Sequence, residues 1–202
     1  MKKWQATQAL SKVFFLIILV FTVQTVEAKA KYVGAVKCGS CHKANYLAWK
    51  TSSHAKAFNI LKPGKRKKAK RLAQLDPEKD YTTDKKCVEC HVTGYRKKGG
   101  FKDIESTPQL AGVSCESCHG AGSKYAVLHD EKMYGFEKKE ATDLGQLYGA
   151  DDETVCLACH SNKDSPFHEG LDAKYKFDWK EKLKVRKAYH PKPKKKSSFS
   201  FM

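Results

Sequence analysis

Hydrophobic residues are sparse along most of the chain, and the longest apolar run lies near its start, from Val13 to Val23. This run follows a lysine-containing segment and precedes the small-residue sequence Val26-Glu27-Ala28, an order that is typical of a secretory signal peptide. We therefore expect residues 1–28 to be a signal peptide and the mature protein to start near Lys29. The run is shorter than the roughly 20 residues that span a bilayer. We expect a periplasmic protein, attached to the membrane only if the signal is retained as an anchor.

Beyond residue 28, apolar and aromatic positions recur at the spacing of a helix and not at that of a strand. Three helices are predicted in this way: one over 43–61, one that opens after Ser123, and one between Asp178 and Pro191. Each carries one histidine on its apolar face: His54, His129 and His190. No stretch shows sustained alternation, so the sequence predicts a mainly α fold with minimal β structure.

A pentad with the form C-x-x-C-H occurs four times, as CGSCH at 38–42, CVECH at 87–91, CESCH at 115–119 and CLACH at 156–160. It uses all eight cysteines: Cys38, Cys41, Cys87, Cys90, Cys115, Cys118, Cys156 and Cys159. Disulfides explain the pattern poorly, because a three-residue spacing closes a tiny loop. Zinc could use the cysteine pairs but leaves the adjacent histidine unexplained. The pentad is the attachment signature of c-type haem, whose two thioether bonds place the next histidine beneath the iron.

Four covalently attached haem c groups are therefore predicted, with His42, His91, His119 and His160 as proximal iron ligands. Charged residues make up 30% of the chain, so the porphyrin faces must supply much of the core. We expect short helices and long loops wrapped around the four haems in a single domain over 29–191.

The second axial position of each iron decides what the protein can do. Methionine is a poor candidate, since the chain has only Met1, Met133 and Met202. Four histidines remain: His54, His129, His168 and His190. Of these, His54, His129 and His190 lie on the predicted helices, and each is expected to bind the iron of a haem other than the nearest one. His168 lies in the loop SPFHEG, where it could bind an iron, line a distal pocket or face solvent.

Several segments resemble the tetrahaem cytochrome c-554 family: YVGAVKCGSCHKANYLAWKTSSHAKAF, CVECHVTGY, GVSCESCHGAGS, CLACHSNKDSPF and FDWKEKLKVRKAYHP. The resemblance implies that His129 is the distal ligand of the first haem, His190 that of the third and His54 that of the fourth. It also implies a five-coordinate second haem whose open face is covered by a loop, matched here by Ser165-Pro166-Phe167. His168 directly after this tripeptide departs from the family pattern.

The formal net charge of +17 comes partly from two basic runs, one over 62–71 and one over 192–196. The haem propionates would offset about half of this charge. Export separates the chain from nucleic acid, so the runs favour an acidic redox partner that is attracted by long-range electrostatics. Such a partner could be a multihaem oxidoreductase, as the resemblance implies, or a quinone-linked cytochrome. Residues 192–202 are expected to form a disordered basic tail.

The sequence predicts a periplasmic electron carrier, not an enzyme, because saturated axial ligation suits electron transfer better than substrate activation. Two alternatives stay open at this point. An open second haem, lined by Pro166, Phe167 and His168, could reduce nitric oxide or another small molecule. The chain could also be a structural subunit of a larger haem conduit.

Overall fold

The computed structural model describes residues 29–132, 135–149, 151–184 and 190–191. The predicted signal peptide at 1–28 and the basic tail at 192–202 lie outside these ranges. All regular elements within them are helical, and the only strand-like pairing there is an isolated antiparallel bridge between Val92 and Ala111. The predicted mainly α fold with minimal β structure is thus confirmed. No helix within these ranges is long and apolar enough to cross a membrane.

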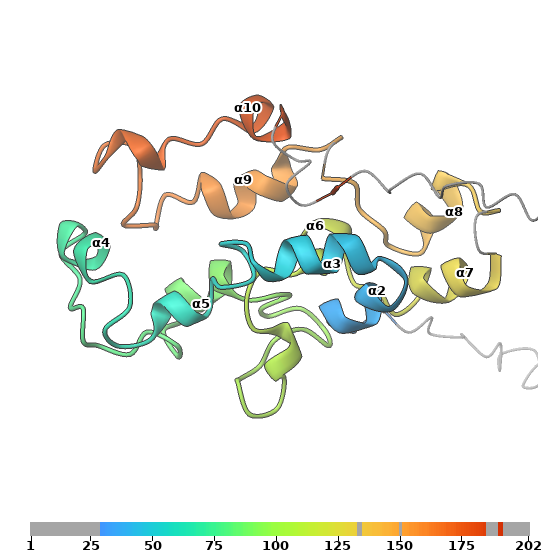
Figure 1. The fold of residues 1–202 in the computed structure, drawn as a ribbon, viewed down its shortest axis with the longest axis horizontal. Coiled ribbons are helices and arrows are strands. Elements are labelled where there is room, and N and C mark those ends of the chain that lie inside the picture. The colour runs from blue at the N-terminus through green and yellow to red at the C-terminus, as the bar shows by residue number, and fades with distance from the viewer. Residues whose placement is uncertain (1–28, 133–134, 150, 185–189, 192–202) are drawn as a thin grey trace, which may run out of the picture.

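The helices are short and are joined by long loops (Figure 1). Their order along the chain is α2 (Ala35–Cys41), α3 (Lys43–Lys50), η1 (Asn59–Leu61), α4 (Lys67–Leu72), α5 (Lys85–His91), η2 (Pro108–Leu110), α6 (Cys115–His119), α7 (Tyr125–Lys132), α8 (Lys138–Asp143), α9 (Thr154–His160), η3 (Ala173–Tyr175) and α10 (Trp179–Lys184).

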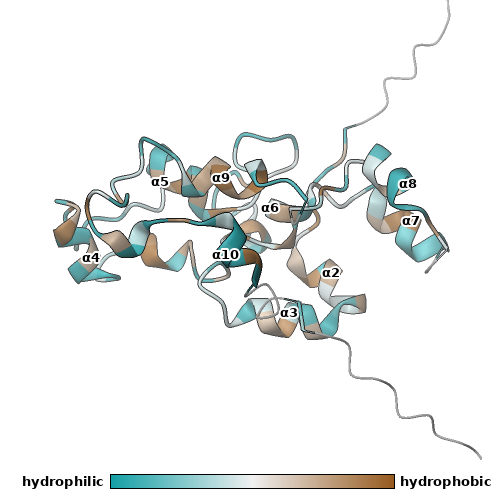
Figure 2. Cartoon of the chain, turned by 90° about the horizontal axis from the view of Figure 1, so that it is seen from above, coloured by the Kyte–Doolittle hydropathy of each residue, from teal (hydrophilic) through white to brown (hydrophobic). Residues whose placement is uncertain are grey.

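The described helices form an elongated arrangement, with α4 and α5 toward one end and α7 and α8 at the other (Figures 1 and 2). The helix α6 lies between these ends, where it contacts both α2 and α9, and α2 also packs on α3. Hydrophilic residues dominate α8 and α10 in Figure 2. The central position of α6 brings the third pentad next to the first and the fourth.

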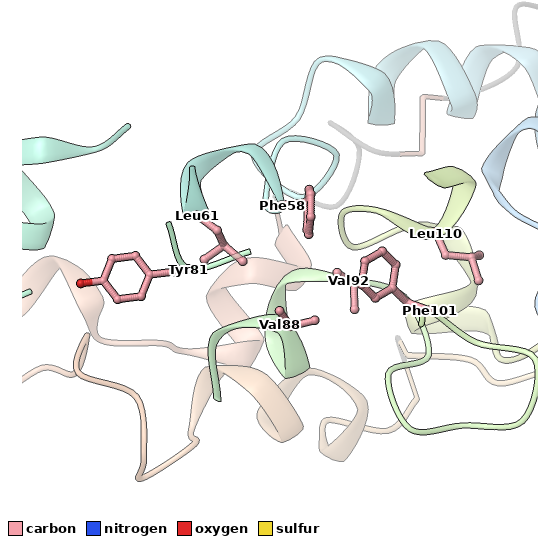
Figure 3. Close-up of a cluster of buried hydrophobic side chains, with 7 residues drawn as sticks. All are labelled: Phe58, Leu61, Tyr81, Val88, Val92, Phe101 and Leu110. Carbon is pink, nitrogen blue, oxygen red and sulfur yellow. The ribbon is translucent and has the colours of Figure 1, made fainter. Parts of the chain in front are cut away.

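The largest group of buried apolar side chains gathers around α5 (Figure 3). It consists of Phe58, Leu61, Tyr81, Val88, Val92, Phe101 and Leu110. The rings of Phe58 and Phe101 meet with 5.6 Å between their centroids, and Leu110 is completely buried. This cluster, which we call the α5 core, packs the second pentad against η1 and η2.

The single helix predicted over 43–61 is wrong, because α3 ends at Lys50 and the chain continues in turns as far as η1. Side chains just beyond α3 explain its end. The Thr51 hydroxyl donates to the Ala48 carbonyl at 3.0 Å, and the Ser52 hydroxyl accepts from the Ala55 N–H at 3.1 Å. Such local hydrogen bonds compete with the helical ladder. His54 therefore lies in a turn and not on a helix.

The other two predicted helices are present. The helix α7 carries His129, and α10 begins at Trp179 after the predicted cap, since the Asp178 carboxylate accepts from the Glu181 N–H at 3.0 Å. The described part of α10 ends at Lys184. Residues 185–189, which were predicted to extend this helix to His190, lie outside the described ranges.

Candidate haem centres

Each pentad forms the last turn of a short helix. His91, His119 and His160 are the final residues of α5, α6 and α9, and His42 joins α2 to α3. Because residues three apart lie on one face of a helix, both thiols of a pentad are presented on the same side. All eight cysteines lie in the described part.

The first centre combines the pentad of α2 with His129 from α7. The His129 ring lies between Tyr125 and Phe136, with ring centroids 5.8 and 4.3 Å away. Its Nε2 is buried, and the Gln146 side chain lies nearby. Burial lowers the pKa of His129 and nearby His42 lowers it further, whereas Gln146 and Asp130 raise it. A buried imidazole close to a proximal histidine is a candidate second ligand for the iron.

The third centre brings together His119 of α6 and His190, which follows α10 by six residues. Their ring centroids are 5.9 Å apart and the rings are nearly perpendicular, at 77°. The Nδ1 of His119 lies 3.2 Å from the Leu147 carbonyl oxygen. This carbonyl can accept a hydrogen bond from the Nδ1–H and so leave the Nε2 lone pair free to bind a metal.

The fourth centre pairs His160 of α9 with His54 from the turn after α3. Their ring centroids are 6.1 Å apart, and Phe177 stacks on His160 at 4.2 Å. The His54 turn is held by its backbone, since the His54 carbonyl accepts from the Val113 N–H at 3.0 Å. Gly112 has φ +85°, and a Cβ there would lie 2.7 Å from the Ala55 carbonyl oxygen. Glycine is therefore needed where the two segments approach.

These imidazole pairs fit the axial ligands of a haem iron. With iron–nitrogen distances near 2 Å and each nitrogen about 1 Å from its ring centre, two axial imidazoles have centroids roughly 6 Å apart. The distances of 5.9 and 6.1 Å agree with this value. Across the described ranges, no three side chains among His, Cys, Asp and Glu converge as a metal-binding group. Facing pairs without a third ligand suit a metal whose other four ligands come from a porphyrin.

The second centre is built differently around His91 of α5. Burial lowers the pKa of His91, and its Nδ1 lies 2.7 Å from the Ala57 carbonyl oxygen. No imidazole of the described residues is recorded beside it. His168 is exposed, and Phe167 packs edge-on against Tyr175 at 5.4 Å. The structure thus places a second imidazole opposite the histidines of the third and fourth pentads and brings His129 near His42, and within the described residues it records no contact between His168 and His91.

Cysteine side chains that lie near one another relate the four centres. Cys38 of the first pentad lies beside Cys115 of the third, and Cys90 of the second lies beside Cys159 of the fourth. Cys118 of the third lies near Cys156 of the fourth. The pentads therefore follow one another in space in the order first, third, fourth, second. This order could not be inferred from the spacing of motifs along the chain.

Apolar side chains remain exposed next to the pentads. Val36 lies two residues before Cys38, Val127 lies two residues before His129, and the Leu147 carbonyl contacts His119; these side chains are 69%, 50% and 46% exposed. Exposed apolar groups usually mark a surface that another apolar body covers. A porphyrin face is such a body, so these residues fit a haem beside the first and the third pentad.

Two buried polar residues near the pentads were not identified from the sequence. Thr93 is completely buried, and its hydroxyl donates to the Gly112 carbonyl at 2.8 Å and accepts from the Ser114 N–H at 2.9 Å. Glu116 is 1% exposed and binds backbone N–H groups. The only sequence signal for Glu116 is an acidic residue inside a pentad, which a solvent-exposed side chain would explain equally well.

Comparison with known proteins identifies the family. Residues 37–120 match the family described as cytochrome c554 and c-prime. Cytochrome c-554 of Nitrosomonas europaea is 42% identical over 185 residues, which cover 83% of this chain and 78% of that protein. The solved structure of reduced cytochrome c554 from Nitrosomonas europaea aligns with a TM-score of 0.71 at 43% identity and covers 78% of this chain and 83% of that one. The chain therefore belongs to the cytochrome c-554 family and is an electron-transfer protein with four covalently attached haem c groups.

Proposed function

We propose that the protein is a periplasmic electron carrier in which three haem irons have two histidine ligands each: His42 with His129, His119 with His190, and His160 with His54. The observation that carries this proposal is the separation of the imidazole pairs, 5.9 and 6.1 Å in the third and fourth centres. His91 is the one proximal histidine without a second imidazole among the described residues. The sequence of residues 1–28, typical of a signal peptide, supports the periplasmic location.

The chain's own residues prepare each site for electron transfer. Haem, when bound, takes up one electron and returns it. The carbonyls of Leu147 and Ala57 lie 3.2 and 2.7 Å from the Nδ1 atoms of His119 and His91 and so orient these rings. Phe177 stacks on His160 and shields it from water. Because paired imidazoles leave no position for a substrate, these three centres pass electrons without chemistry on a ligand.

The proximity of pentads supports transfer through the molecule in the order first, third, fourth, second. The neighbouring cysteines Cys38 and Cys115, Cys118 and Cys156, and Cys90 and Cys159 relate successive members of this series. Electrons would thus enter at one end of the molecule and leave at the other.

The second centre also supports a minor alternative function. With one histidine ligand, its iron could bind a small molecule such as nitric oxide, and the exposed His168 could donate a proton to it. This alternative requires a ligand-binding position at the second haem. The same measurement therefore tests the ligation pattern and the alternative.

The decisive experiment is paramagnetic resonance of the oxidised protein. We expect three low-spin signals and one high-spin signal. His168→Ala is expected to leave this spectrum unchanged, whereas the control His54→Ala gains a second high-spin signal. If the wild type lacks a high-spin signal and the His168→Ala protein shows one, His168 is an iron ligand and the proposed ligation is wrong. An unchanged spectrum under nitric oxide would exclude the alternative.

The proposed partner is an acidic redox protein that docks on α4. Of the basic run over 62–71, Lys70 is buried with its Nζ donating to the Lys62 carbonyl at 2.9 Å, and Lys67 pairs with Glu78. The exposed cations that remain form what we call the α4 basic cluster: Lys62, Lys65, Arg66, Lys68 and Arg71. Such a cluster attracts an acidic surface over several ångströms.

The α4 basic cluster lies near the second centre. Lys70 of α4 places its Nζ 5.0 Å from the centroid of the Tyr81 ring, and Tyr81 belongs to the α5 core that packs the second pentad. The second pentad is also the last in the spatial order of the four. A partner on α4 would therefore exchange electrons with the second haem, and either a multihaem oxidoreductase or a quinone-linked cytochrome with an acidic surface fits this description.

A carboxylate-terminated electrode serves as the probe for this docking surface. We expect the double variant Lys68→Glu/Arg71→Glu to lower the rate of electron transfer at the electrode roughly tenfold at low salt. The matched control Lys97→Glu/Lys98→Glu makes the same charge change on an exposed loop and should retain most of the rate. Equal rates for the two variants would exclude the α4 basic cluster as the docking surface.

A further inference from the structure

Glu116, inside the third pentad, is a buried carboxylate with an unusual set of partners. Its side chain accepts four hydrogen bonds from three backbone N–H groups. Val33 donates to Oε1 at 2.9 Å and to Oε2 at 3.1 Å, Gly34 donates to Oε2 at 2.7 Å, and Gly122 donates to Oε1 at 2.7 Å. The residue is 1% exposed. The geometry therefore satisfies both carboxylate oxygens without water.

This environment suits an ionised carboxylate. All of the recorded partners are donors, and the nearby Tyr125 hydroxyl donates to the Gly120 carbonyl at 2.9 Å. A protonated carboxyl group would bring an O–H donor of its own to a site whose partners are N–H donors, and this O–H would lack an acceptor among them. Hydrogen bonds to a charged acceptor are also roughly twice as strong as neutral ones.

The field of this charge reaches the groups around the first and third pentads. Burial raises the pKa of Tyr125, and Glu116 raises it further. The same two causes, in the same order, raise the pKa of Tyr32. The ring centroids of Tyr125 and His129 are 5.8 Å apart, and we propose His129 as a ligand of the first haem. The charge of Glu116 therefore acts on Tyr32, which precedes α2, and on Tyr125 of α7.

The same bonds connect the two helices that carry the first centre to the helix that carries the third. Gly34 is the residue before α2, which holds the first pentad, and Gly122 lies at the start of the turn into α7, which holds His129. Both are bound to one side chain of α6. The proximal and the proposed distal ligand of the first haem therefore share Glu116 as an anchor.

We propose that Glu116 is a positioning residue that aligns the two ligands of the first haem and lowers the reduction potentials of the first and third haems. The electrostatic reason is that oxidised haem carries one more positive charge than reduced haem, and a negative charge in a poorly screened interior stabilises it. The alignment half of the inference rests on the proposed ligation by His42 and His129. The electrostatic half needs only the covalent attachment of the two haems.

The test is a spectroelectrochemical titration of the holoprotein, with paramagnetic resonance recorded on the same samples. Glu116→Gln removes the charge at nearly constant shape. We expect two of the four haems to show about a tenfold higher reduced-to-oxidised ratio at a fixed potential, equal to about 59 mV for a one-electron couple. The matched control Glu89→Gln makes the same change in the second pentad, where the carboxylate is exposed. Glu89→Gln should change the reduced-to-oxidised ratio of each haem by less than about threefold, because solvent screens an exposed charge.

A second variant separates charge from alignment. Glu116→Asp keeps the charge and shortens the side chain, so we expect potentials within about threefold of the wild-type ratios and a changed low-spin signal from one haem. Potentials in Glu116→Gln that match those in Glu89→Gln would overturn the electrostatic role. Glu116→Gln could fail to accumulate as holoprotein, and Glu116→Asp then provides the test. Paramagnetic resonance spectra of Glu116→Asp that equal those of the wild type would overturn the alignment role, because the shorter side chain should disturb the ligands of the first haem. Failure of the proposed ligation would instead appear in the wild-type spectrum.

Discussion

The second and third pentads have the same cysteine and histidine spacing, but the fold holds them in different ways. In the second, the residue after the first cysteine is Val88, which is 3% exposed and packs in the α5 core. In the third, the equivalent residue is Glu116, which is equally buried but binds backbone N–H groups. The C-x-x-C-H spacing thus specifies haem attachment. The variable residue determines whether apolar packing or a charged hydrogen-bond cluster supports it.

The surroundings of the two histidines follow the same division. His119 of the third pentad faces His190 with 5.9 Å between ring centroids. His91 of the second is oriented by the Ala57 carbonyl, and no second imidazole is recorded beside it in the described residues. The second pentad thus packs on the α5 core, whereas the histidine of the third faces an imidazole from a distant part of the chain.

Preventing haem attachment should have the largest effect and should separate the two regions. Without iron, the imidazoles that we propose as axial ligands would lose the metal that joins them, and the free energy of haem binding would no longer contribute to folding. We expect circular dichroism to show the loss of most helix. In hydrogen exchange, the α5 core should keep partial protection while the region over 115–160 loses it. Equal protection of both regions would contradict the comparison.

Truncating the α5 core should have the next largest effect. Leu110 is completely buried, so Leu110→Ala is expected to lower the free energy of unfolding of the holoprotein by about 2–5 kcal/mol. The control Leu47→Ala alters a leucine that is 52% exposed. It should change the free energy of unfolding by less than about 0.5 kcal/mol. Denaturant titration followed by circular dichroism measures both. Equal losses would show that burial around α5 does not stabilise the protein.

Thr93 joins the two regions, and its loss should have an intermediate effect. Thr93→Val keeps the shape but removes the acceptor of the Ser114 N–H at the start of the third pentad. An unsatisfied buried donor costs about 1–3 kcal/mol, so we expect a loss of that size in the same titration. Thr51→Val is the control, because its hydroxyl is exposed. A loss no larger than the control's would mean that water or another group replaces the hydroxyl.

The surface ion pair beside the α5 core should have the smallest effect. Lys67 and Glu78 meet at 2.7 Å, with side chains that are 50% and 59% exposed. Glu78→Gln is expected to cost about 0.2–1 kcal/mol at low salt and almost nothing at high salt. Glu105→Gln, at another exposed glutamate, provides the baseline. A loss comparable to that of Leu110→Ala would show that charge pairing, and not apolar burial, distinguishes this region.

Sequence reasoning succeeded where the chemistry is local. The pentads predicted four covalently attached haem c groups, which the family confirms. The lack of alternating apolar and polar positions predicted a mainly α fold, as the described residues show. It failed at the helix over 43–61, because apolar periodicity could not reveal that the hydroxyls of Thr51 and Ser52 bind the backbone instead. His54 nevertheless reaches His160, since a turn held by Val113 and Gly112 presents it as well as a helix would.

By itself, the sequence determined the kind and number of the cofactors, because the attachment signature of c-type haem lies within one turn of helix and occurs four times. It also supplied the number of spare histidines. Only the tertiary structure decided which imidazoles face each other, in which order the pentads lie, and that Glu116 points inward. These features depend on contacts between residues far apart in the chain, and such contacts form only when several helices and loops have packed together.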